Sequence, residues 1–177
     1  MLRLAAKAPR LRPPLMSNVR RLVFARKPFR PGDYFTVPLE DSTPGPFALG
    51  QVLSVEPQAL NSCGCAFWPS VAGDHVRQLC TPPIIVTLVT PDLLKSKIWK
   101  ILGNAAVTVP TRARKYEAFR KSGWVGAKII GSGIVRSALR AYNGLEYWDD
   151  FADPEYVSKL LQPGVGVPSH ARFKRDA

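Results

Sequence analysis

The sequence predicts an α+β protein, with a small antiparallel, barrel-like β sheet and short helices, the main ones near the C-terminus. Two alternating apolar runs within residues 32–55 flank a segment rich in Pro, Gly, Ser and Thr, which is typical of two paired strands and their turn. A short apolar run at 84–89 is bounded by prolines, and helix start and stop signals gather after residue 137. The length of 177 residues fits one domain.

The first two strands should form a hairpin over one core. Apolar side chains alternate along both arms, at Phe35, Val37 and Leu39 and then at Phe47, Leu49, Leu53 and Val55. Gly50 interrupts the second arm, which indicates a bulge or a close approach of another group to the backbone.

The middle of the chain continues with short elements. We expect a strand near 66–68, a polar connection or short helix over 70–80, and a buried strand over 84–89. Thr90, Pro91 and Asp92 resemble a helix start, so a short helix should cover 92–96.

A second hairpin is predicted next, with arms at 98–102 and 106–109 joined by a Gly-Asn turn. The charged stretch 112–121 reads as a loop with one helical turn, and strand character returns around a Gly-Ser-Gly turn at 131–133. Ser137 should cap a helix over 138–142, and a second helix should follow Asp153 over 154–162.

These predictions divide the chain into a basic flexible tail (1–27), a single domain (28–162) and a C-terminal tail (163–177). Residues 1–30 contain nine Lys or Arg and no acid, whereas the rest contains sixteen basic and thirteen acidic residues. The leader is open to three interpretations: an organelle transit peptide, a nucleic-acid-binding arm, or an upstream extension without a role, with Met16 as an alternative start. We favour the extension.

No apolar run reaches the roughly 18 to 20 residues that cross a bilayer, and prolines and arginines interrupt any secretory signal. The three cysteines, an odd number, argue against a closed set of disulfides and favour a reducing compartment. We therefore expect a reducing compartment and no membrane partner.

The sharpest candidate for chemistry is the group Cys63, Cys65, His75 and Cys80, because three thiolates and one imidazole could bind zinc. One residue between the paired cysteines makes joint chelation cramped, so free, partly buried thiols are the preferred interpretation. A Cys-His nucleophile pair would need His75 or His170, and no spacing favours it. We therefore expect no metal, no cofactor and no enzymatic activity.

Two surface patches could bind a partner. Arg112, Arg114 and Lys115 begin a basic cluster that runs to Lys121 and includes Tyr116 and Phe119, as a nucleic-acid contact or a solvated loop would. The acidic candidates are Glu40 and Asp41 in the first turn, and Asp149 and Asp150 beside Trp148 and Tyr147. Exposed aromatics that anchor, with charges that steer, would suit an interface with a basic partner.

The stretches GDYFTVPLEDS, FALGQVLSV, IWKILGN and KIIGSGIVRSALRAYNGLE resemble, in this order, immunity protein family 26 of bacterial polymorphic-toxin systems, over about residues 28–162. The resemblance implies a cytoplasmic binding module that neutralises a cognate protein toxin without a reaction of its own. Glu40, Asp41, Trp148, Asp149 and Asp150 are the expected contacts. The opening motif is also similar to small-barrel proteins that bind or cleave RNA in toxin and antitoxin pairs, and this is the alternative.

Overall fold

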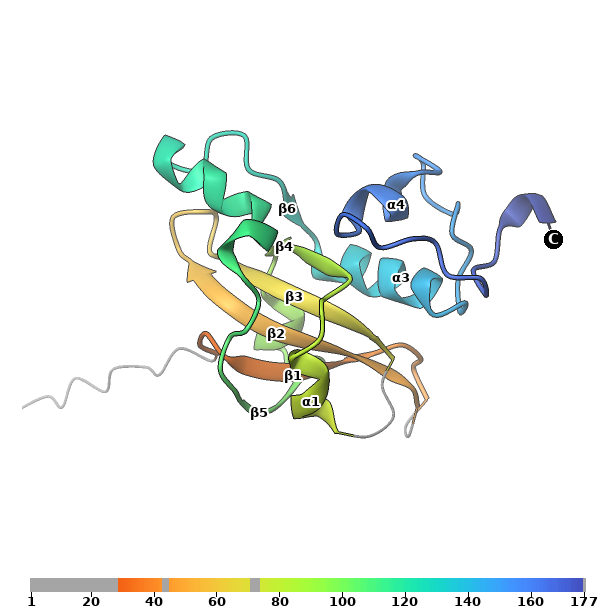
Figure 1. Cartoon of the computed structure of the whole chain (residues 1–177), viewed down its shortest axis with the longest axis horizontal. Helices are drawn as coiled ribbons and strands as arrows, with labels where there is room; N and C mark the ends of the chain where they lie inside the picture. The colour runs from red at the N-terminus through yellow and green to blue at the C-terminus, as the bar shows by residue number, and fades with distance from the viewer. Residues whose placement is uncertain (1–28, 43–44, 71–73, 177) are drawn as a thin grey trace, which may run out of the picture.

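The structure, a computed structural model, describes residues 29–42, 45–70 and 74–176. Its centre is a six-stranded sheet in the order β5-β1-β2-β3-β4-β6 (Figure 1). The strands are β1 (Asp33–Pro38), β2 (Phe47–Glu56), β3 (Ser62–Ser70), β4 (Ile85–Val89), β5 (Lys100–Asn104) and β6 (Ile129–Ile130). All pairings are antiparallel except that of β4 with β6.

The predicted α+β class is confirmed. The predicted barrel-like closure is wrong, because the sheet is open. The strands β5 and β6 lie at opposite ends of the sheet and do not pair with each other. β6 has only two residues, which is too short to carry the sheet round to β5.

The helices are short apart from one. The α-helices are α1 (His75–Leu79), α2 (Asp92–Lys95), α3 (Ser132–Tyr142) and α4 (Tyr156–Leu160), and the 3₁₀ helices are η1 (Thr111–Ala113), η2 (Lys115–Ser122) and η3 (Lys174–Asp176). Within the described ranges, no helix is long and apolar enough to span a membrane.

Both faces of the sheet are covered. On one face, Phe35, Phe67 and Trp99 pack with buried side chains of α3 such as Leu139. On the other face, Leu49, Leu53 and Trp68 pack with Leu79 of α1, Tyr116 of η2 and Trp124. The predicted single core under the first hairpin is therefore wrong. Phe35, Val37 and Leu39 face one cluster, whereas Leu49 and Leu53 face the other, because β2 is a central strand.

Two glycines allow aromatic rings to lie against the sheet. Gly50 pairs directly with Phe35, and a Cβ at Gly50 would clash with the Phe35 ring, which confirms the close approach predicted there. A Cβ at Gly64 would clash with the Tyr116 hydroxyl. The sequence Cys63-Gly64-Cys65 thus places two thiols on one face and leaves room for Tyr116 on the other.

The predicted second hairpin is wrong. β5 covers residues 100–104 and pairs with β1, 64 or more positions earlier in the chain, while 105–109 form no strand. Val107 and Val109 instead pack against the cluster that contains Leu49 and Trp68. A local pattern of alternating apolar residues identified the segment but not its pairing partner.

The start of the long C-terminal helix also differs from the prediction. α3 begins at Ser132, not after Ser137, and the strand before it stops at Ile130. Ser132 donates its hydroxyl to Asp92 Oδ2 at 2.7 Å, and its N–H donates to Thr90 Oγ1 at 3.0 Å. Tertiary hydrogen bonds from the α2 start therefore fix the first turn of α3, which the sequence cannot show.

Other elements match the expectations within a few residues. β3 contains the predicted 66–68 strand, and β4 covers all but the first residue of the predicted 84–89 strand. α2 covers all but the last residue of the predicted 92–96 helix, and α4 covers the centre of the predicted 154–162 helix. The segment after residue 162, expected to be a tail, places Ala171 and Phe173 against the cluster around Trp148. The backbone N–H of Trp148 donates to Arg172 O at 2.7 Å. The predicted leader, residues 1–27, lies outside the described residues.

Candidate functional site

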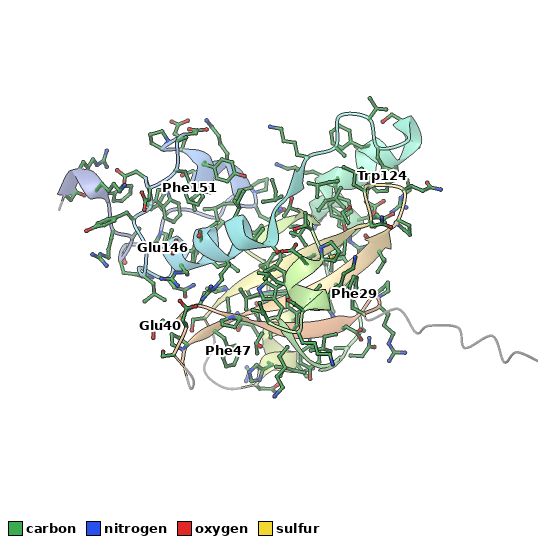
Figure 2. The ribbon with its side chains drawn as sticks, turned by 180° about the vertical axis from the view of Figure 1, so that it is seen from behind. Phe29, Glu40, Phe47, Trp124, Glu146 and Phe151 are labelled. Atoms are coloured by element: carbon green, nitrogen blue, oxygen red, sulfur yellow. The ribbon has the colours of Figure 1, made fainter. Side chains whose placement is uncertain are left out.

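A cavity of about 430 Å³ opens beside the turn between β1 and β2, and we call it the turn cavity. Its lining combines the ends of both strands with residues from other parts of the fold: Thr36, Pro38, Glu40, Asp41, Ser42, Gly45, Pro46, Phe47, Ile98 and Arg136. Figure 2 shows Glu40 and Phe47 at the same end of the sheet, far from Trp124. The turn thus brings two of the predicted partner contacts to a concave surface.

Arg136 of α3 holds the acidic side of the turn cavity in place. Its Nε donates to Pro38 O and its Nη2 donates to Asp41 Oδ1, both at 2.7 Å. The hydrogen bond and charge of Arg136 lower the pKa of Asp41, which stays ionised and whose side chain is 89% exposed. Glu40 accepts a hydrogen bond from Ser42 at 3.0 Å. A partner would therefore meet fixed carboxylates.

The opposite side of the turn cavity is apolar. Phe47 stacks on His75, with ring centroids 5.4 Å apart and planes inclined by 6°, so its ring is fixed. Ile98, just before β5, is 51% exposed although it is a large aliphatic side chain. A hollow with apolar walls and a charged rim can receive an anchoring side chain of another protein.

The second predicted acidic site lies differently from the expectation. Trp148 is only 2% exposed and donates its indole N–H to Ser158 Oγ at 3.1 Å, so the expectation of an exposed aromatic anchor is wrong. Asp149 accepts from the Lys174 N–H at 2.8 Å, and Asp150 forms an ion pair with the Lys174 side chain. These two carboxylates connect the C-terminal segment to the domain.

The basic cluster is partly embedded in the fold. Arg112 and Lys115 are exposed at η1 and η2, but Arg114 donates to Val109 O at 2.6 Å. Tyr116 is 6% exposed and lies 3.4 Å from Ser54 Oγ through its hydroxyl, and burial raises its pKa to about 12. Because the tyrosine ring is buried, it is not available to stack on a nucleic-acid base.

The structure does not bring together the four candidate metal ligands. Cys63 and Cys65 are buried with their Sγ atoms 3.6 Å apart, whereas Cys80 is exposed and donates to Val76 O. Burial raises the pKa of Cys65, which keeps it a thiol. Within the described ranges, no group of three or more His, Cys, Asp or Glu side chains could hold a metal ion.

Within the described residues, the acidic side chains all have partners, whereas many basic side chains do not pair with a carboxylate. All thirteen acidic residues lie in the described ranges, and each makes an ion pair or accepts a hydrogen bond within the chain. Many cations in the described ranges have no carboxylate within ion-pair distance: Arg77, Lys95, Lys97, Lys100, Arg112, Arg114, Lys115, Lys121, Lys128 and Arg172. The charge left open to a partner is therefore mainly positive.

Sequence reasoning missed Arg136 and Ile98 as parts of the turn cavity. Both come from segments about 60 and 95 positions away from the turn, and no local pattern points to the contact. The one available signal for Ile98 was its position next to Trp99, where an alternating strand must expose one of two large apolar neighbours.

Comparison of the chain with family models, curated proteins and solved structures finds no match.

Proposed function

We propose that this protein is a non-enzymatic binding module of the immunity type, which neutralises a protein toxin by occupying its surface. The turn cavity is the observation that carries the proposal. It is hollow, its apolar wall includes the half-exposed Ile98, and Glu40 and Asp41 stand on its rim with fixed geometry. Such a site binds an anchoring side chain in its centre and charged groups at its edge.

The immunity assignment itself comes from the sequence resemblance described above. The fold supports the proposal because Arg136 of α3 connects Asp41 to Pro38 O at the end of β1, which holds the turn in one conformation. A preorganised surface loses less conformational entropy on association than a flexible one does. Tight inhibition by simple occupation requires this property.

The direct test is rescue of bacteria from a toxin encoded beside this gene. Co-expression should restore growth, and the two proteins should co-purify as a stoichiometric complex. Growth arrest that persists despite full expression of this protein, together with separate elution of the two proteins, would refute the proposal.

A pair of matched variants tests the turn cavity in the same system. Ile98→Arg should weaken toxin binding about fivefold or more, since central apolar contacts contribute about 1 to 3 kcal/mol each. Val125→Arg is the control, because Val125 is 76% exposed and does not line the turn cavity. Equal affinity of both variants and the unmodified protein would show that the toxin binds elsewhere.

A second candidate function, RNA binding, is favoured by one observation. Lys115 and Lys128 line a cavity of about 270 Å³ between η2, β4 and α4, and neither has a carboxylate partner among the described residues. RNA affinity should then fall steeply with salt and should fall further on substitution of Arg112, Arg114 and Lys115. Unchanged RNA affinity in that triple variant would contradict this function.

A further inference from the structure

β5 has one edge without a partner strand. It is the end strand of the sheet and pairs only with β1 in the part of the chain that the structure describes. Its residues are mostly exposed, and Ile101 and Leu102 are 36% and 42% exposed. An open edge presents backbone N–H and C=O groups that another extended chain can pair with.

A third cavity, of about 240 Å³, is lined partly by Lys100 and Ile101 of this strand, and we call it the lysine cavity. Every polar side chain that lines it is a hydrogen-bond donor: Lys95, Lys97, Trp99 and Lys100. The three lysines are exposed and have no ion pair within the described ranges, and Trp99 Nε1 is buried without an acceptor there. A ligand that supplies hydrogen-bond acceptors and negative charge would therefore complement the site.

Charge excludes two obvious occupants of the edge. A second copy of the chain, paired through β5, would add further lysines to the edge and no carboxylate, because lysine is the only charged residue in β5 and in the lysine cavity. Residues 1–28 of this chain contain eight Lys or Arg and no acid, so they are repelled as well. An acidic chain meets neither obstacle.

We infer that the open edge of β5 is a docking site for an extended, acidic segment of a partner protein. The segment adds a seventh strand beside Lys100–Asn104, and one of its carboxylates enters the lysine cavity. Backbone hydrogen bonds supply affinity, and the lysines select acidic sequences. This inference needs a partner protein but does not depend on toxin neutralisation.

The same features should also oppose aggregation through this edge. The pairing of β5 with β1 shifts register between Tyr34 and Phe35, which leaves Leu102 as an extra residue on β5. Lysines and bulges on an edge strand oppose pairing between identical chains. The lysines leave the edge open to a chain of opposite charge. The same residues therefore oppose pairing between identical chains and favour binding of an acidic segment.

The test uses the full-length protein and a synthetic decapeptide in which Glu alternates with Val. Its affinity is measured by calorimetry and its position by amide hydrogen exchange. A peptide with Lys in place of Glu tests the charge requirement, and a Glu peptide N-methylated at every residue keeps the charge but lacks the backbone N–H donors on both edges. A ten-residue oligouridylate tests nucleic acid.

Two charge-matched variants locate the site. In the first, Lys95, Lys97 and Lys100 are changed to Glu; in the second, Lys115, Lys121 and Lys128 are changed to Glu. The first should weaken binding of the Glu peptide about tenfold or more, since each exposed ion pair contributes up to about a factor of five and repulsion adds to the loss. The second should change it less than about twofold.

The Glu peptide should protect the β5 amides from exchange, and both the Lys peptide and the N-methylated peptide should bind at least about tenfold more weakly. No binding of the Glu peptide, equal binding of its N-methylated form, or equal affinity in the two triple variants would each overturn the inference. It is also overturned if oligouridylate binds through Lys95, Lys97 and Lys100 more tightly than the peptide does. Toxin rescue is scored separately, so either proposal can fail alone.

Discussion

Arg120 of η2 connects the outer layer of the fold to the sheet, and its removal gives a sharp test of the packing. Its guanidinium donates to both carboxylate oxygens of Glu56, at 3.0 and 2.6 Å, and also to Glu117 at 2.8 Å. It also lies 4.8 Å from the centre of the Trp124 ring. The Glu56 side chain is only 6% exposed, so Arg120→Met leaves a carboxylate without its cation in a nearly dry site.

The expected loss is about 2 kcal/mol in the free energy of unfolding. Breaking a fully buried ion pair costs about 3 to 5 kcal/mol, but Arg120 is 48% exposed, and water can partly replace it. Arg120→Met with Glu56→Gln should recover part of the loss, because the remaining group is then neutral. Urea unfolding followed by circular dichroism measures the single and the double variant.

Lys121→Met is the matched control, since Lys121 is adjacent and exposed, and should change stability by less than about 0.5 kcal/mol. The hydrogen bond from Arg120 lowers the pKa of Glu117, so its contribution is present above the carboxyl pKa of the unfolded chain and is lost as pH falls through the lower folded value. The cost of Arg120→Met should therefore shrink in acid. A cost equal to that of Lys121→Met at neutral pH would refute the reasoning.

Three further outcomes follow from the same packing. Gly64→Ala should destabilise the protein by about 2 kcal/mol in urea unfolding, since its Cβ would clash with Tyr116 and with Ser54 Oγ. Tyr116→Phe should relieve only part of this cost, because the ring carbon Cζ and Ser54 Oγ would still clash with the added Cβ. A thiol reagent should label Cys80 rapidly in the native protein and Cys63 and Cys65 only after unfolding; fast labelling in a Cys80→Ser variant would contradict the packing. Absorbance titration should show one tyrosine ionising near pH 12, absent in Tyr116→Phe, with stability complete below the unfolded pKa of about 10 and lost as pH rises through the folded value.

The two proposed interfaces divide the surface by chemistry. The turn cavity combines an apolar wall with the carboxylates of Glu40 and Asp41, while the lysine cavity offers only donors. Ile98 lines the first cavity, and its neighbours Lys97 and Trp99 line the second, so the segment before β5 separates the two. One partner could therefore contact both, with an anchor in one cavity and an extended acidic segment along β5.

Local patterns predicted most individual elements but few of their contacts. Alternation identified β1 and β2, an apolar run bounded by prolines identified β4, and the Thr90-Pro91-Asp92 signal identified α2. The same reasoning paired the 98–102 segment with its neighbour at 106–109, whereas β5 pairs with β1. Strand pairing depends on which edges are free in the assembled sheet, and a window of ten residues does not contain that information.

For the candidate site too, the sequence predicted individual residues but not their contacts. The sequence singled out Glu40, Asp41, Asp149 and Asp150 because acidic residues near turns and aromatics are easily recognised. Only the fold shows that Arg136 binds Asp41 and that Lys174 binds Asp150. It also shows that Trp148, chosen as an exposed anchor, is part of the core.

By itself, the sequence determined the α+β class, the positions of most strands and the concentration of positive charge in the leader, because these depend on local periodicity and composition. The tertiary structure decided which face each apolar residue occupies, that the sheet remains open, and which charges are left without a partner. Those properties arise from contacts between segments far apart in the chain. The turn cavity and the open edge of β5 both belong to this second group.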